Sequence, residues 1–148
     1  MRKAIQPEQD NACDSLIVTD VPLRGLPAPF LEALEGREEL LISSREGSRL
    51  GAVRGWFVLE APGVVYLFAD AHSTRARRWR VDPWVRLTVP GTASSIEAKV
   101  QFVDATEIDD RLADLVVERW GMWGAATPPG LRRMLRDGSH VLLRIDGR

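Results

Sequence analysis

Short apolar segments of strand length, separated by turn residues, are the feature of this sequence that most limits its fold. They lie at residues 40–44, 50–59, 64–69, 84–89, 96–103 and 141–145. The first three are linked by short turns rich in glycine and proline, as in successive antiparallel strands. A doubly wound parallel sheet would need a helix after almost every strand. The pattern therefore predicts a mainly β fold, α+β in the wide sense: a six-stranded antiparallel barrel with peripheral helices.

Helix signals occur between some of these strands, at residues 29–35, 74–81, 106–120 and 128–136. Ser73 and Thr106 are predicted N-caps, since a hydroxyl can accept a hydrogen bond from a free N–H of the first turn. In residues 106–120 apolar side chains recur every three or four positions, which predicts the one long amphipathic helix. Residues 96–103 alternate between apolar and polar side chains. This pattern predicts a buried face with Ile96, Ala98, Val100 and Phe102 and a solvent-exposed face with Glu97, Lys99 and Gln101.

Length and charge limit the function classes. The 148 residues suit one domain, so we expect an N-terminal arm at 1–26 and one domain at 27–148. A net charge of -1 gives no global attraction for nucleic acid or anionic lipid. The only cysteine, Cys13, excludes an internal disulfide. No apolar run is long enough to span a membrane and the first residues are polar, so we expect a cytoplasmic protein without membrane or nucleic-acid partners.

A phosphate site is the clearest chemical signal, at Ser73, Thr74 and Arg75. An apolar strand leads into a helix start here, where free N–H groups and the helix dipole favour an anion. Arg78 lies one turn after Arg75 and could reach the same anion. The spacing alone is equally typical of an ordinary serine cap on a helix with a solvated arginine face.

Three segments resemble the flavin-binding split-barrel family related to pyridoxamine 5'-phosphate oxidase. Residues 41–47 (LISSREG) are similar to the family's first strand and turn, and residues 53–57 (VRGWF) to its second strand, which ends in a Trp-Phe pair. Residues 73–85 are similar to its Ser-x-Lys/Arg helix, followed by a strand that begins after proline. The resemblance implies a split barrel, a homodimer, and an FMN-dependent or deazaflavin (F420)-dependent oxidoreductase acting on a small molecule.

The resemblance also implies which residues hold the cofactor. Carried over by position, the phosphate ligands are Ser73, Thr74, Arg75 and Arg78, and the ring neighbours are Ser43, Ser44, Arg54, Gly55 and Trp56. FMN is favoured because the predicted site is a phosphate site at a helix start, whereas F420 would also need basic residues for its acidic tail. Arg45 or Arg49 could meet that need. No catalytic side chain is predicted, since the cofactor carries out the hydride transfer.

Two departures from the family pattern bear on function. Arg54 stands where many relatives have proline, which could alter access to the ring, and Arg75 replaces a common lysine but keeps its charge. A C-terminal arginine motif of true pyridoxamine phosphate oxidases is missing, so oxidation of vitamin B6 is not expected. A non-catalytic ligand-binding split barrel is the alternative from another class.

Other residues support fewer hypotheses. Trp120 and Trp123 flank glycines and predict either a lid over a flat ring or, more commonly, packing in a core or a dimer seam. His72 and His140 have no companions at metal-ligand spacing, so no metal site is predicted. Nucleic-acid binding by the arginine-rich residues 75–80 with Trp79 and Trp84 is disfavoured by the near-neutral charge.

Overall fold

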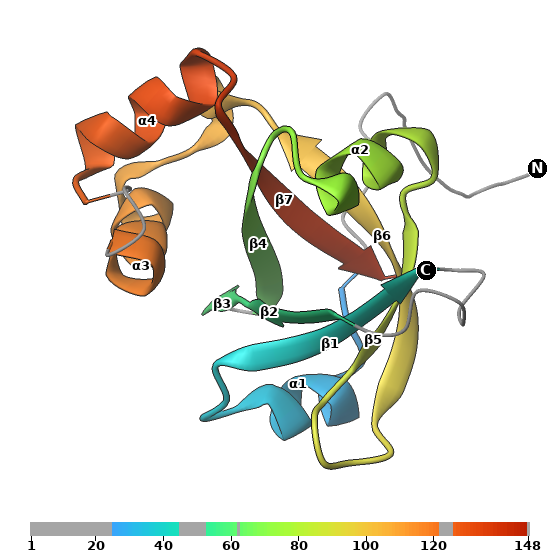
Figure 1. Ribbon diagram of the computed structural model, residues 1–148. Helices are drawn as coiled ribbons and strands as arrows, with labels where there is room; N and C mark the ends of the chain where they lie inside the picture. Colours follow the sequence, from blue (N-terminus) through green and yellow to red (C-terminus); the bar gives the residue numbers. More distant parts are fainter. Residues whose placement is uncertain (1–24, 45–52, 62, 122–125, 148) are drawn as a thin grey trace, which may run out of the picture.

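The computed structural model describes residues 25–44, 53–61, 63–121 and 126–147. Their strands form one antiparallel seven-stranded sheet, in the order β2-β1-β5-β6-β7-β4-β3, that curls into a nearly closed barrel (Figure 1). The strands are β1 (Glu39–Ser44), β2 (Val53–Trp56), β3 (Val58–Glu60), β4 (Val64–Asp70), β5 (Trp84–Thr88), β6 (Ser95–Val103) and β7 (His140–Gly147). The predicted antiparallel barrel is confirmed.

The strand count corrects the prediction, because the segment predicted at 50–59 is two strands in its described part. β2 pairs with β1, whereas β3 pairs with β4 at the other end of the sheet order. Phe57 lies between them, buried, and its N–H donates to the Glu38 carbonyl oxygen (3.3 Å). One continuous segment therefore joins both edges of the sheet. Both faces of the segment 50–59 are largely apolar in sequence, which is typical of a strand buried on two sides, but Val53 in its first half is 43% exposed.

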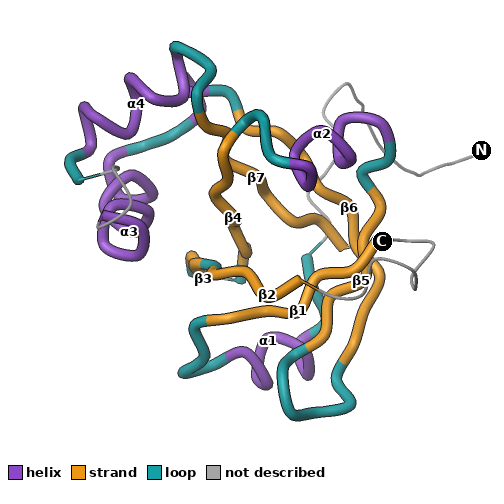
Figure 2. Tube along the Cα trace, in the orientation of Figure 1, coloured by secondary structure: helices purple, strands orange, loops and turns teal. Residues whose placement is uncertain are grey.

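Helices cover the barrel on three sides (Figure 2). They are α1 (Ala28–Leu34), α2 (Thr74–Val81), the 3-10 turn η3 (Ala105–Glu107), α3 (Asp110–Trp120) and α4 (Pro128–Arg136). The prediction of a single helix from Thr106 is wrong. Asp104 caps the 3-10 turn with a capping box, and Asp109 caps α3 by accepting from the Leu112 N–H (2.8 Å). Two caps in succession end one turn and start a new helix.

The buried side chains form two clusters, one on each side of the sheet. The first joins Phe30 and Leu34 of α1 to inward side chains of the strands, so α1 closes this core. The second packs α3 and α4 on β4 and β7, with Leu112, Val116 and Leu131 at its centre. Adjacent residues of β7 belong to different clusters because side chains of a strand alternate between faces.

β6 departs from its predicted pattern at the end of the strand. Ala98 and Val100 are buried as expected, but Phe102 is 38% exposed. The Arg80 guanidinium lies 5.2 Å from the centroid of the Phe102 ring and covers it in part. Among the described residues, no helix has the length and apolar character needed to cross a membrane.

Candidate functional site

The candidate site is a cavity of about 350 Å³ where β2 and β4 meet the first turn of α2, the last turn of α3 and the start of β7. We call it the arginine pocket. The described residues that line it are Arg54, Gly55, Trp56, Phe68, Ala69, Asp70, Arg75, Trp120 and His140. Its volume lies within the range of about 300–1,000 Å³ that is usual for small-molecule sites.

Arg75 is the cation of the pocket that has no carboxylate partner among the described residues. Ser73 caps α2 by accepting from the Ala76 N–H (3.1 Å), and this start of the helix directs Arg75 over Trp79, at 5.7 Å from the ring centroid. Among the described residues, no carboxylate forms an ion pair with Arg75. Burial lowers the pKa of the Arg75 guanidinium. A half-buried cation without a partner is costly unless an anion joins it.

Gly55 gives the Arg75 guanidinium its space. A Cβ on Gly55 would lie 3.2 Å from Arg75 Nη1 and 3.1 Å from Ile42 Cδ1. These distances are tighter than ordinary van der Waals contact, so any larger residue would push on the guanidinium. The predicted second-strand glycine is therefore in contact with the predicted phosphate arginine.

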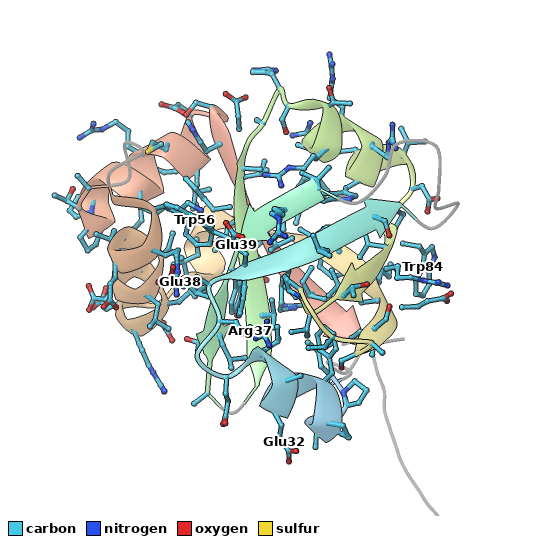
Figure 3. All side chains as sticks on the ribbon, turned by 60° about the horizontal axis from the view of Figure 1, so that its bottom comes forward. Glu32, Arg37, Glu38, Glu39, Trp56 and Trp84 are labelled. Carbon is cyan, nitrogen blue, oxygen red and sulfur yellow. The ribbon has the colours of Figure 1, made fainter. Side chains whose placement is uncertain are left out.

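Arg54 differs from Arg75 in its surroundings. Its Nη1 lies 3.2 Å from Glu39 Oε1, and both side chains are exposed. The register of β1 and β2 explains the pair, because Glu39 lies opposite Trp56, two residues from Arg54. Figure 3 shows Glu39 and Trp56 close together on this side of the barrel. Arg54 is thus partly neutralised, and Arg75 remains the main attraction for an anion.

The opposite wall of the pocket is aromatic. Phe68 contacts Trp120 (ring centroids 5.5 Å apart, tilted at 47°) and stacks on His140 (5.1 Å, 10°). Trp120 is 6% exposed and belongs to the outer core cluster, so it packs as much as it lines the pocket. Trp123 lies outside the described residues. A flat ring could pack against such a wall.

His140 was missed by the analysis of the sequence, as were Phe68 and Asp70. His140 lies directly opposite Asp70 where β4 and β7 pair. The pairing of two strands about seventy residues apart brings these groups together, and no local motif signals it. In the sequence, the signal for His140 was its position directly before the strand predicted at 141–145.

The other predicted cofactor residues lie near the pocket or elsewhere. Ser73 and Thr74 at the start of α2 do not line the pocket, and neither does Arg78 in its last turn. Ser43 lies on β1 opposite Arg86 of β5, with its hydroxyl 3.5 Å from the Arg86 carbonyl oxygen. The side chain of Ser44 and the whole of Arg45 and Arg49 lie outside the described residues. The assignment of all these residues to a cofactor stays a prediction.

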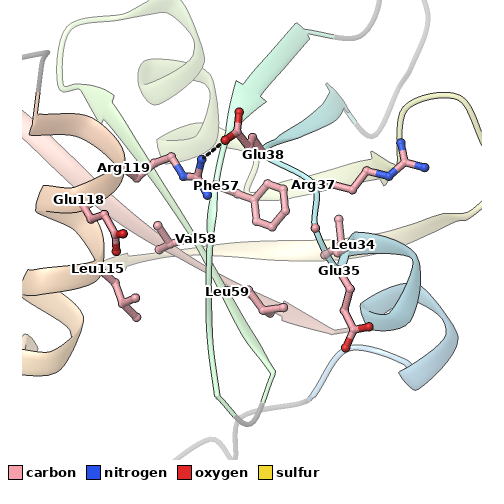
Figure 4. A pocket seen from close by; sticks show the side chains of 11 residues that line it. Leu34, Glu35, Arg37, Glu38, Phe57, Val58, Leu59, Leu115, Glu118 and Arg119 are labelled. Atoms are coloured by element: carbon pink, nitrogen blue, oxygen red, sulfur yellow. Dashed lines mark ion pairs between the residues drawn. The ribbon is translucent and has the colours of Figure 1, made fainter.

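A second, larger cavity of about 500 Å³ lies between α1, α3 and the junction of β2 with β3 (Figure 4). Arg119 crosses it to Glu38 (3.4 Å), while Arg37 points away from its centre and donates to the Pro90 carbonyl oxygen. The buried Nε of Arg119 has no hydrogen-bond partner among the described residues. No predicted cofactor residue lines this cavity. Within the described residues, no group of acidic, histidine or cysteine side chains is placed to hold a metal ion.

No protein-family model and no curated protein matches the sequence. Solved structures do match the fold. Rv2991 of Mycobacterium tuberculosis aligns over 85% of this chain and 82% of its own, with 18% identity and a TM-score of 0.56. A candidate pyridoxamine 5'-phosphate oxidase of Listeria innocua aligns over 79% and 89%, with 15% identity and a TM-score of 0.53. The heme storage protein HutZ of Vibrio cholerae aligns over 79% and 86%, with 15% identity and a TM-score of 0.51.

These matches define the class of the protein. The chain has the split-barrel fold of the pyridoxamine 5'-phosphate oxidase-like proteins, as the resemblance in its sequence predicted. Identities of this size establish the fold and leave the ligand to the residues of the site.

Proposed function

We propose that the protein is an FMN-binding oxidoreductase that transfers a hydride to or from a small organic molecule. The observation that carries the proposal is Arg75, a half-buried guanidinium at the start of a helix that follows a buried strand. Within the part of the chain that the structure describes, no carboxylate pairs with it. Such a helix start favours a phosphate. FMN would supply the hydride chemistry in this site.

The residues of the pocket, together with the neighbouring N-cap of α2, fit the parts of such a cofactor. Arg75 and the hydroxyl of Ser73, which accepts from Ala76 but keeps its own hydrogen to donate, suit the phosphate. Gly55 admits a close approach to the backbone of β2, and Trp56 and Trp120 offer faces for a planar ring. The heme storage protein with the same fold binds another flat ring, which supports a planar ligand for the pocket.

Titration of the purified protein with FMN, followed by quenching of flavin fluorescence, tests the proposal. Arg75→Ala should weaken binding about 10- to 100-fold, since a charge-assisted hydrogen bond contributes about 1.5–3 kcal/mol. Arg77→Ala is the matched control, because Arg77 is exposed on the same helix and does not line the pocket. Equal affinities of the wild type and Arg75→Ala would exclude the phosphate assignment.

The same titration with F420 separates the two cofactors. Saturable binding of F420 without FMN would identify a deazaflavin-dependent reductase of the same fold. Binding of neither would favour the non-catalytic ligand-binding protein.

We further propose that the protein is a homodimer, as the resemblance implies. Light scattering of the full chain should then give about twice the chain mass of 16.5 kDa. A mass of one chain at micromolar concentration would contradict this.

A further inference from the structure

We propose that His140 is the group of the arginine pocket that exchanges a proton with the substrate, through its Nε2 atom. This inference rests on the proposed oxidoreductase function. The observations that carry it are the hydrogen bonds of its neighbour Ser139, which select one tautomer of the ring, and the place of His140 in the lining of the pocket.

The hydroxyl of Ser139 decides which ring nitrogen carries the hydrogen. The hydroxyl of Ser139 donates to the Met134 carbonyl oxygen, at 3.3 Å from Oγ. A carbonyl oxygen only accepts, so this bond uses the single hydroxyl hydrogen. Ser139 Oγ is also 3.0 Å from His140 Nδ1. Oγ can only accept in that contact, and Nδ1 must be the donor.

The neutral ring of His140 therefore carries its hydrogen on Nδ1 and a lone pair on Nε2. No described residue forms a hydrogen bond with Nε2. Stacking on Phe68 holds the plane of the His140 ring, and the contact with Ser139 fixes the orientation of the ring within that plane. Nε2, which is separated from Nδ1 by Cε1, is left as the nitrogen that can exchange a proton with a ligand in the pocket.

The charges around the ring come from several elements. Asp137, after α4, is held by the N–H of Ser139 (3.0 Å), and this hydrogen bond lowers the pKa of the Asp137 carboxyl. Asp70 of β4 lies directly opposite His140. Arg75 of α2 and Arg54 of β2 line the same pocket, while α3 contributes the uncharged Trp120. The ring thus has the carboxylates of Asp137 and Asp70 and the guanidinium groups of Arg75 and Arg54 among its neighbours.

The chemistry that we assign to Nε2 is the proton step of a two-electron reduction. When a quinone takes up a hydride at one carbonyl oxygen, an electron pair moves through its ring to the other carbonyl oxygen, which needs a proton. Protonated His140 gives the hydrogen on Nε2 to that oxygen and keeps the hydrogen on Nδ1. The ring becomes neutral and water protonates it again. Oxidation of a substrate runs these transfers in reverse.

Nitrogen NMR of the labelled full chain tests the tautomer without any cofactor. The chain has two histidines, so His72→Gln assigns both rings. We expect a protonated Nδ1 and a bare Nε2 in neutral His140, and a shift toward the other tautomer in Ser139→Ala. A hydrogen on Nε2 in the wild type would overturn the proposal and leave the proposed FMN function untouched.

Reduction of the quinone menadione by protein loaded with reduced FMN tests the proton step. His140→Gln should slow the reoxidation of the bound flavin by about 100-fold, within the usual range for general acid catalysis, and should flatten its pH dependence. Each variant is loaded with FMN to saturation before reoxidation starts, so that the rate reports the proton step, and His72→Gln should react normally. An unchanged rate and pH profile in His140→Gln would refute the proton role. Absence of FMN binding in the wild type would refute the proposed function and the proton role together.

Discussion

Tyr66 shows at the scale of a single residue how the sheet changes a side chain's chemistry. It points to the outer core cluster, and its hydroxyl donates to Glu60 Oε1 (3.4 Å). Burial and the nearby Glu60 carboxylate disfavour the charged phenolate, and together they raise the pKa of Tyr66 to about 12. Arg144 acts in the opposite direction, with a smaller effect.

This shift predicts a loss of stability at high pH. In the unfolded state the tyrosine releases its proton near pH 10, while in the folded state it keeps the proton to about pH 12. As the pH rises between these values, the unfolded state is therefore stabilised relative to the folded state. The free energy of unfolding from urea titrations should fall over this window, and Tyr66→Phe should remove that part of the dependence. Because Tyr66 is the only tyrosine, phenolate absorbance follows it directly, and a midpoint near 10 in the native protein would contradict the prediction.

Gly55 links the packing of the barrel to the pocket. In Gly55→Ala the new methyl group would meet Ile42 Cδ1 and Arg75 Nη1 at 3.1 and 3.2 Å. We expect a stability loss of about 1–3 kcal/mol from overpacking, together with weaker FMN binding because the guanidinium must move. Urea unfolding and FMN quenching measure the two effects. Gly25→Ala is the control, since its added Cβ meets no atom within 4 Å, and equal behaviour of the two variants would contradict the close packing.

The elements of the fold show where local signals suffice. Predicted helices with a cap and a stop signal, such as α2 after Ser73 and α4 before Gly138, agree closely with the structure. The region 104–110 was harder, because Asp104, Thr106 and Asp109 are all able to cap a helix. The way α3 packs on the sheet decides which of these residues caps the helix.

Replacement of these caps tests that assignment. Asp109→Ala should cost about 0.5–2 kcal/mol of stability, because the Leu112 N–H loses its partner at the start of α3. Thr106→Ala should cost less than about 0.5 kcal/mol, since its exposed hydroxyl only donates to Asp104. Urea unfolding followed by circular dichroism gives both values. A larger loss for Thr106→Ala would restore the helix start predicted from the sequence.

For the whole molecule, β7 connects the two core clusters. Leu143 belongs to the cluster inside the barrel and its neighbour Leu142 to the cluster under α3 and α4. A change in one cluster is therefore transmitted through the same strand to the other, and we expect the described domain to unfold as one unit.

Two large-to-small substitutions test this connection. Leu87→Ala in the barrel and Leu131→Ala under α4 remove fully buried side chains, and each should cost about 2–5 kcal/mol. In both variants tryptophan fluorescence and circular dichroism should give one coincident urea transition. Separate transitions in Leu131→Ala would show that the helices unfold independently of the barrel.

The sequence by itself determined most of the strands, most helix ends and the class of fold, because these depend on periodicity and on capping groups a few residues apart. The likeness of residues 73–85 to a phosphate-binding helix also lay within one local segment. Part of the candidate site was accessible in the same way, since Arg54, Gly55, Trp56 and Arg75 do line one pocket.

Only the tertiary structure decided which of the predicted residues meet and what faces them. The break at Phe57 arises because one segment must pair with both edges of a curved sheet. The stacking of His140 on Phe68 depends on the pairing of β4 with β7, two strands far apart in the chain. A local pattern cannot encode such contacts, since they exist only once burial of the two cores has set the register of the barrel.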